Sequence, residues 1–150
     1  MSRREDESVQ AVPGYKEANY PYIPLAIEAS VETIVGDFEI TDVDIFALYG
    51  SSRVTAVPAG SRFEIHAKYK IQNGSPGALL GGYWSTCMTV WDVTRGKAVG
   101  YDIFGSHYGG GVLTAEDAVN VVMPASATTF RVKIFANQLW DAPVPPESSW

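Results

Sequence analysis

The residues of this sequence that could do chemistry are few and widely spaced. His66 and His107 are the two histidines, and Cys87 is the single cysteine. Nucleophilic catalysis needs a nucleophile, a base and an orienting group that converge on one point. No GxSxG, HExxH or CxxC pattern occurs. The sequence therefore predicts a protein that is not an enzyme and that uses no cofactor.

The two histidines and the cysteine have different settings. His66 lies in an alternating stretch between Glu64 and Lys68, which predicts a solvated residue on an outer strand face. Cys87 lies in the middle of an apolar strand pattern, where a buried and inert thiol is expected. His107 follows Gly105 and Ser106 in a Gly-rich loop that could shape a ligand pocket, although no βα pattern precedes it.

Acidic residues gather in one part of the chain. Six of them, and no Lys or Arg, lie between residues 28 and 44. Asp42 and Asp44 could offer carboxylates to a calcium ion from one strand face. The alternatives are a solvated acidic edge that discourages aggregation and pairing with cations of the next strand, such as Lys70. Apart from this weak calcium option, no metal is expected.

Composition and charge narrow the class of protein. The chain has 150 residues, is 46% hydrophobic and carries a net charge of -6, which describes one globular domain. The negative charge argues against nucleic acid as a direct partner. No apolar run reaches the roughly 20 residues that span a bilayer. The opening MSRREDESVQ has no apolar core, so no secretory signal is expected and a cytoplasmic location stays open.

Three zones follow one another along the chain. Residues 1–24 form an extended arm rich in Pro and Tyr, and residues 141–150 form a Pro-rich tail. Residues 25–140 carry the periodic apolar pattern and predict the folded domain. In the clearest stretch, residues 62–72, apolar and polar residues alternate strictly, which is typical of a half-buried antiparallel strand.

Further strands are predicted along this zone. They cover residues 27–35, 37–47, 83–93, 98–104, 118–123 and 128–137. Residues 94–97 predict a tight hairpin turn. Residues 37–47 contain a one-residue phase slip, which indicates a bulge or a strand that crosses between sheets. Residues 114–117 resemble a capping box, but the β-branched residues after them allow one helical turn at most.

These elements predict an all-β fold. Seven or eight short strands separated by turns indicate a single immunoglobulin-like antiparallel β-sandwich with extended N- and C-terminal arms. The expected core residues come from three of the predicted strands. They are Phe63, Ile65, Tyr69, Trp84, Val132 and Ile134.

Several of these pieces occur together in a known pattern. They are the stretches GDFEITDVDIF and VPAGSRFEIHAKYKIQNGSPG and the Trp-bearing strand that follows them. On these pieces the chain resembles immunoglobulin-like bacterial and archaeal adhesion modules of the CARDB type. The resemblance covers residues 37–137. It implies a sandwich fold with a binding or scaffolding role, and it transfers no catalytic residues. The lone domain and the Gly-rich loop at residues 105–113 depart from the family pattern.

The arms carry the strongest functional signal. Disordered tails are normally poor in large aromatic residues, whereas Tyr and Trp are favoured in protein interfaces. The candidate interface residues are Tyr15, Tyr20, Tyr22, Trp140 and Trp150. The arms could bind a neighbouring subunit or fold back over the edges of their own sheets.

The sequence therefore favours a structural or interaction module that self-associates within a larger assembly, such as a virion, a tail or an extracellular filament. A second hypothesis is a carbohydrate- or surface-binding module. A third is a small enzyme or ligand-binding protein that uses the His107 loop. The candidate ligand-binding residues are Trp91, Tyr101, His107 and Tyr108.

Overall fold

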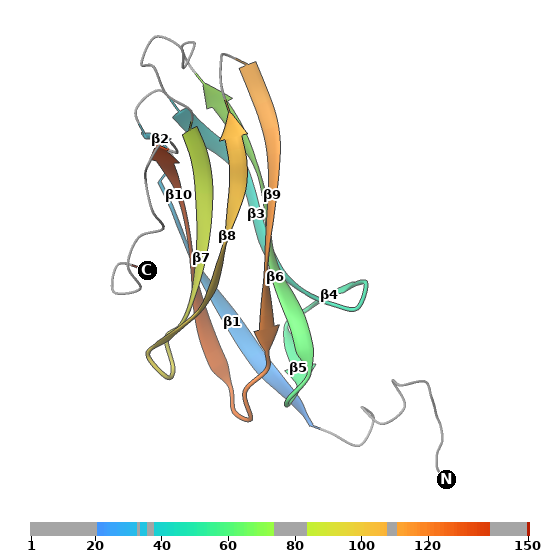
Figure 1. The fold of residues 1–150 in the computed structure, drawn as a ribbon. Helices are drawn as coiled ribbons and strands as arrows, with labels where there is room; N and C mark the ends of the chain where they lie inside the picture. Colours follow the sequence, from blue (N-terminus) through green and yellow to red (C-terminus); the bar gives the residue numbers. More distant parts are fainter. Residues whose placement is uncertain (1–20, 33, 36–37, 74–83, 108–110, 139–149) are drawn as a thin grey trace.

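Long strands account for most of the described chain (Figure 1). The computed structural model describes residues 21–32, 34–35, 38–73, 84–107, 111–138 and 150, and these contain no helix. The long strands are β1 (Tyr22–Val31), β3 (Phe38–Tyr49), β6 (Arg62–Asn73), β7 (Trp84–Asp92), β8 (Lys97–His107), β9 (Gly111–Val122) and β10 (Thr128–Gln138). The short strands are β2 (Ile34–Val35), β4 (Ser52–Val54) and β5 (Ala56–Pro58).

The strands form two sheets that pack face to face. The first sheet has the order β5-β1-β10-β7-β8, and the second has the order β2-β3-β6-β9 with β4 paired to β3. β1 runs parallel to β10, whereas the other strand pairs are antiparallel. A parallel pair needs a long connection, and here that connection comprises the rest of the domain.

The all-β sandwich predicted from the sequence is confirmed. The immunoglobulin-like subclass and the count of seven or eight strands are not confirmed, since the described residues form ten strands, seven of them long. Immunoglobulin domains place strands A, B, E and D in one sheet and C, F and G in the other. In this protein the first, fourth, fifth and seventh long strands share one sheet, and the second, third and sixth share the other.

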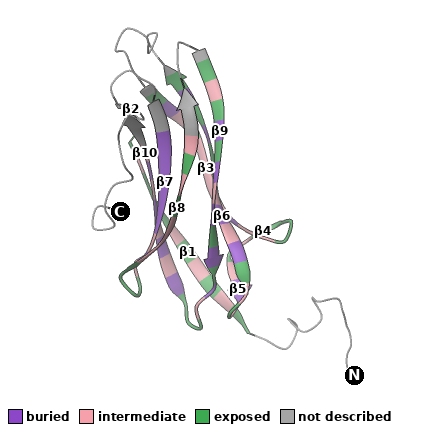
Figure 2. Cartoon of the chain, in the orientation of Figure 1, coloured by how far each residue is buried: buried purple, intermediate pink, exposed green. Residues whose placement is uncertain are grey.

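The core lies between the sheets and follows the predicted alternation. On β6, Phe63, Ile65, Ala67, Tyr69 and Ile71 are all buried, and the residues between them face outward. Opposite them on β10, Phe130, Val132 and Ile134 are buried as well. Figure 2 shows how buried and exposed positions are distributed along the strands. Phe63 and Phe130 join the two sheets by an edge-to-face contact with ring centroids 6.1 Å apart. The side chain of Trp84, the remaining predicted core residue on β7, is not among those that the structure describes, so its burial stays a prediction.

The phase slip predicted in residues 37–47 is a β-bulge. The register between β3 and β6 shifts between Thr41 and Asp44. Asp42 lies inside the bulge with a φ of 55°, a left-handed conformation that Asp tolerates better than most residues. β3 stays within one sheet, so the alternative of a strand crossing between sheets does not apply.

Other local predictions had mixed outcomes. The hairpin at residues 94–97 is confirmed, with Gly96 at a φ of 69° and its N–H donating to the Asp92 carbonyl at 2.8 Å. Residues 114–117 form no helical turn, because they pair with β6 throughout as part of β9.

No helix in the described residues is long and apolar enough to cross a membrane.

Arg95 connects two turns at one end of the sandwich. Its guanidinium donates to Asp92 Oδ2 at 3.1 Å, to Thr128 Oγ1 at 2.9 Å and to Ser126 Oγ at 2.7 Å. Asp92 is 1% exposed, so its carboxylate depends on the Arg95 guanidinium and on the Arg95 backbone N–H, which lies 2.9 Å from Oδ1.

We expect Arg95→Ala to lower the free energy of unfolding by about 1–3 kcal/mol, because it removes a partner from a buried carboxylate. Urea denaturation would measure the change. Arg62→Ala, at an exposed position, is the matched control and should change stability by less than about 0.5 kcal/mol. Equal losses in the two variants would contradict the assignment.

Candidate functional site

Asp42 and Asp44, which could have offered carboxylates to a calcium ion, each form an ion pair with a basic side chain. Lys70 Nζ is 3.3 Å from Asp42 Oδ2, and Arg53 Nη2 is 2.7 Å from Asp44 Oδ2. Both pairs are largely exposed, so each contributes less than about 1 kcal/mol. The alternative of pairing with the next strand is thus confirmed for Lys70, whereas Arg53 comes from a short strand that was not predicted. Among the described residues, no group of three or more acids, His or Cys could hold a metal ion.

An aromatic stack covers His66 on the outer face of the second sheet. Arg53 lies over the Phe46 ring, with its Cζ 3.8 Å from the ring centroid, and Phe46 stacks on the His66 imidazole at 5.5 Å. Nε2 of His66 is 2.6 Å from Glu64 Oε1, and Nδ1 is 3.4 Å from Glu116 Oε2.

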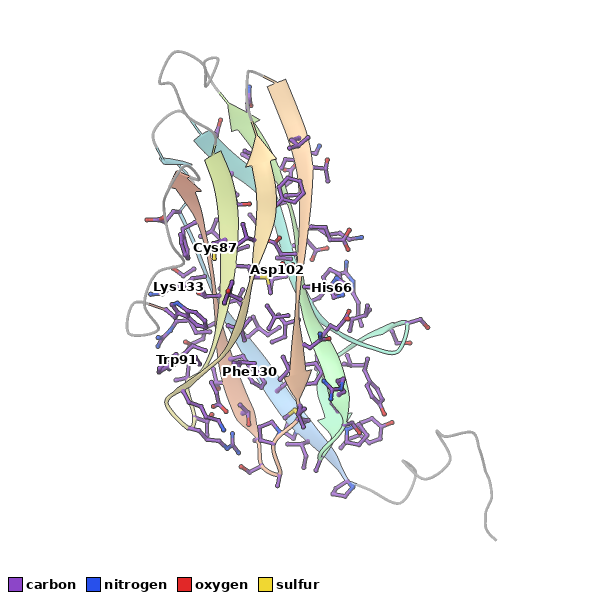
Figure 3. All side chains as sticks on the ribbon, in the orientation of Figure 1. His66, Cys87, Trp91, Asp102, Phe130 and Lys133 are labelled. Carbon is purple, nitrogen blue, oxygen red and sulfur yellow. The ribbon has the colours of Figure 1, made fainter. Side chains whose placement is uncertain are left out.

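The prediction for His66 was therefore half right. The side chain is on the outer face, but it is 14% exposed because Phe46 covers it. Figure 3 places His66 on the side of the molecule away from Trp91 and Lys133. The sequence could not reveal the stack, because it depends on the register that sets Phe46 opposite His66.

Trp150 packs against its own chain on the outer face of the first sheet. Its side chain is 7% exposed and meets Tyr101 edge to face, with ring centroids 6.0 Å apart. Arg131 Nη1 donates to the Trp150 carbonyl at 3.3 Å. Of the two alternatives left open for the C-terminal tail, Trp150 thus follows the one in which the chain folds back.

The other predicted site residues are scattered. Tyr22 begins β1 and is 53% exposed, and Tyr101 is 50% exposed. Trp91 is half-buried and shares its outer face with Tyr101, because Tyr101 pairs with Thr89, two residues before Trp91 on β7. His107 ends β8, but its side chain lies outside the described residues. Also outside them lie Tyr15, Tyr20, Tyr108 and Trp140.

A buried polar cluster between the sheets was missed by the sequence analysis. The Tyr69 hydroxyl donates to Asp117 Oδ2 at 2.7 Å and lies 2.5 Å from Thr86 Oγ1. All three side chains are at most 1% exposed. Asp117 Oδ1 has no hydrogen-bond partner among the described residues. Burial of a carboxyl group in the core, with one oxygen lacking a hydrogen bond, strongly disfavours its charged form.

Burial controls the proton affinity of this cluster. Desolvation, with a smaller repulsion from Asp102, raises the pKa of Asp117 to about 7, although the Tyr69 hydrogen bond opposes the rise. Burial, followed by the Asp117 charge, raises the pKa of Tyr69 above its usual value. Burial and the same two carboxylates raise the pKa of Cys87 to about 12, so the thiol stays protonated and inert. This fits the prediction of a buried, unreactive cysteine.

The two lateral sides of the sandwich differ. On one side β8 packs closely against β9, where the Ala118 N–H donates to Asp102 Oδ2 at 2.9 Å. A Cβ at Gly100 would lie 3.0 Å from Val119 Cγ1, so this seam has no room for a further side chain. The opposite side, between β1 and β3, is open.

The open side holds a groove of about 430 Å³. Its lining is mostly apolar and comes from β1, β3 and the segment that crosses between the sheets. The lining residues are Leu25, Ala26, Ile27, Ile45, Phe46, Ala47, Arg53, Val54 and Thr55. Leu25, Ile27 and Ile45 are half-buried and pack against the core, so the groove lies at the margin of the core.

Backbone groups along this groove are also unpaired. β1 pairs with β5 through residues 22–24 and with β10 through residues 25–31. On the groove side, residues 26–31 have no strand partner among the described residues. We call these residues the free edge of β1. An unpaired edge beside an apolar groove is a template for another strand.

The hydroxyl and the carboxylate that meet in the core, those of Tyr69 and Asp117, are buried, whereas the groove beside β1 opens to the surface. No protein-family model matches the chain, and no curated protein matches it.

Proposed function

We propose that this protein is a non-enzymatic structural or interaction module that associates with copies of itself as a subunit of a larger assembly. The observation that carries the proposal is the open side of the sandwich, where the free edge of β1 borders an apolar groove of about 430 Å³. Soluble monomers usually cover or charge such an edge, because it recruits other chains.

The distribution of chemical groups supports the same proposal. Cys87 is buried with a raised pKa, and His66 is enclosed by Phe46, Glu64 and Glu116. Asp117 is buried and meets the hydroxyl of Tyr69, which in turn lies beside Thr86. The resemblance of residues 37–137 to CARDB-type adhesion modules also fits, because such modules scaffold or bind. A place in a virion, tail or filament is part of the proposal.

We expect the molar mass of the full-length protein to rise above the 16.3 kDa of one chain as its concentration increases. Size-exclusion chromatography with light scattering would measure this. Apolar burial at the groove should drive the association. The control is the same protein in mild urea, below its unfolding transition, where the mass should fall toward that of one chain. A mass that stays at one chain at every concentration would refute the proposed function.

A second candidate, carbohydrate binding, rests on the aromatic face of the first sheet. Tyr101 is half-exposed, and Trp91 lies on the same face. Exposed aromatic rings can stack on the apolar face of a sugar. A glycan array would test this, and binding that disappears in Tyr101→Ala would favour the second candidate. We rank it lower because Trp150 already covers part of the Tyr101 ring.

A further inference from the structure

We propose that the free edge of β1 accepts an extended strand from the N-terminal arm of a second copy, centred on residues 8–12. This inference rests on the proposed self-association and names the segment that occupies the groove. Three observations support it: the unpaired backbone of β1, the bulged and charged edge of β3, and the sequence of residues 8–12.

The acceptor backbone is set by two hydrogen bonds of β1. The Leu25 N–H donates to the Thr55 carbonyl at 3.0 Å, on the side away from β10. The Glu32 N–H donates to the Ile134 carbonyl of β10 at 3.0 Å, on the opposite side. Successive backbone groups of a strand alternate in direction. The peptide groups of Ile27, Ala29 and Val31 therefore point away from β10, beside the groove at Ile27 and beyond it at Ala29 and Val31, ready to pair with an added strand.

The edge of β3 is a poorer acceptor than the edge of β1. Its backbone is interrupted by the bulge at Asp42, and Asp44 is held in an ion pair with Arg53. Bulges and charges are the devices by which sheet edges avoid pairing. Residues 25–31 of β1 contain neither proline nor a bulge, and Glu28 is their one charged residue.

The donor is chosen from the part of the chain that precedes the sheet. Residues 1–20 lie outside the described residues, and the chain enters β1 at Tyr22. Within this arm, residues 8–12 read SVQAV, which in an extended strand places Val9 and Ala11 on one face and Ser8, Gln10 and Val12 on the other. Such small apolar side chains suit a groove lined by Leu25, Ile27 and Ile45. Charged residues precede this segment, and Pro13-Gly14 ends it.

Geometry favours a second copy over the same chain. β5 occupies the groove side of β1 at residues 22–24, immediately where the arm leaves the sheet. To reach Ile27, the arm of the same copy would have to reverse direction and pass around β5. An arm of up to 20 residues, at about 3.3 Å per residue, reaches a neighbouring molecule without that reversal.

The test uses full-length chains that carry one added cysteine each. One copy carries Ala11→Cys and the other carries Ala29→Cys, while the native Cys87 is buried and fully protonated at neutral pH. After mixing under mild oxidation, we expect a disulfide between the two copies on a non-reducing gel. Val122→Cys, which is exposed on β9 at the far edge of the second sheet, replaces Ala29→Cys as the matched control and should give little product.

Proline variants supply a second readout. Ala29→Pro removes a backbone donor on the groove side, and Ala11→Pro interrupts the arm without touching the folded domain. Each should weaken self-association by about tenfold or more, as expected from the loss of one or two hydrogen bonds and the pairing around them. Ser2→Pro, outside the donor segment, is the control for the arm and should leave association unchanged.

The outcomes separate this inference from the proposed function. If the protein self-associates but neither proline variant weakens it, and no cross-linked dimer forms, the inference is wrong and the proposed function stands. A disulfide that forms only within a single chain carrying both Ala11→Cys and Ala29→Cys would also overturn the inference, by showing that the arm binds its own groove. A monomeric full-length protein would refute both.

Discussion

Replacing Asp117 by asparagine is expected to stabilise the protein above pH 7 and to flatten the dependence of its stability on pH. Asp117 is 1% exposed, and its Oδ1 has no hydrogen-bond partner among the described residues. An asparagine has nearly the same shape, can still accept the hydrogen bond from Tyr69 and stays neutral at every pH. The substitution therefore isolates the cost of a buried negative charge.

The direction follows from the two pKa values of Asp117. Burial raises its pKa from 3.8 to about 7 in the folded protein, so the folded state holds the proton more tightly than the unfolded state does. The stability due to this proton is fully present below pH 4 and is lost as the pH rises through 7. Each pH unit between the two values corresponds to about 1.4 kcal/mol, so the total is on the order of 4 kcal/mol.

Urea denaturation between pH 4 and pH 8 would measure this effect. The parent protein should lose stability across this range, whereas Asp117→Asn should lose much less and should exceed the parent at pH 8. Glu39→Gln, which removes an exposed acid from β3, is the matched control and should follow the parent curve. Parallel curves for the parent and Asp117→Asn would show that Asp117 does not titrate in this range.

Truncation of the core should have a comparable effect at neutral pH. We expect Ile65→Ala and Ile134→Ala each to lower the free energy of unfolding by about 2–5 kcal/mol, because both side chains are 0% exposed and would leave cavities. For a domain whose total stability is about 5–15 kcal/mol, either loss would lower the melting temperature markedly.

Val122→Ala provides the control for the core variants. Val122 is 54% exposed at the end of β9, so its truncation should cost less than about 1 kcal/mol. Calorimetry or urea denaturation of the three variants would give the comparison. If Ile65→Ala and Ile134→Ala unfolded at the parent temperature, the faces assigned to β6 and β10 would be reversed.

The sequence by itself determined the strands with a clear period of two. On β6, residues 63, 65, 67, 69 and 71 are apolar and all are buried, because a half-buried strand exposes alternate side chains to water. The bulge at Asp42 was also readable, since one extra residue in a strand shifts the apolar phase. The short strands β4 and β5 were missed, because three residues are too few to show a period.

Only the tertiary structure decided which residues meet across the sheets. Residues 114–117 resembled the start of a helix, yet pairing with β6 makes them a strand and turns Asp117 toward Tyr69 and Thr86. His66 is covered because the register sets Phe46 opposite it. The free edge of β1 depends on strand order, which local patterns do not encode. The physical reason is that periodicity reports which face of a strand avoids water, whereas partners and edges are set by contacts between residues far apart in the chain.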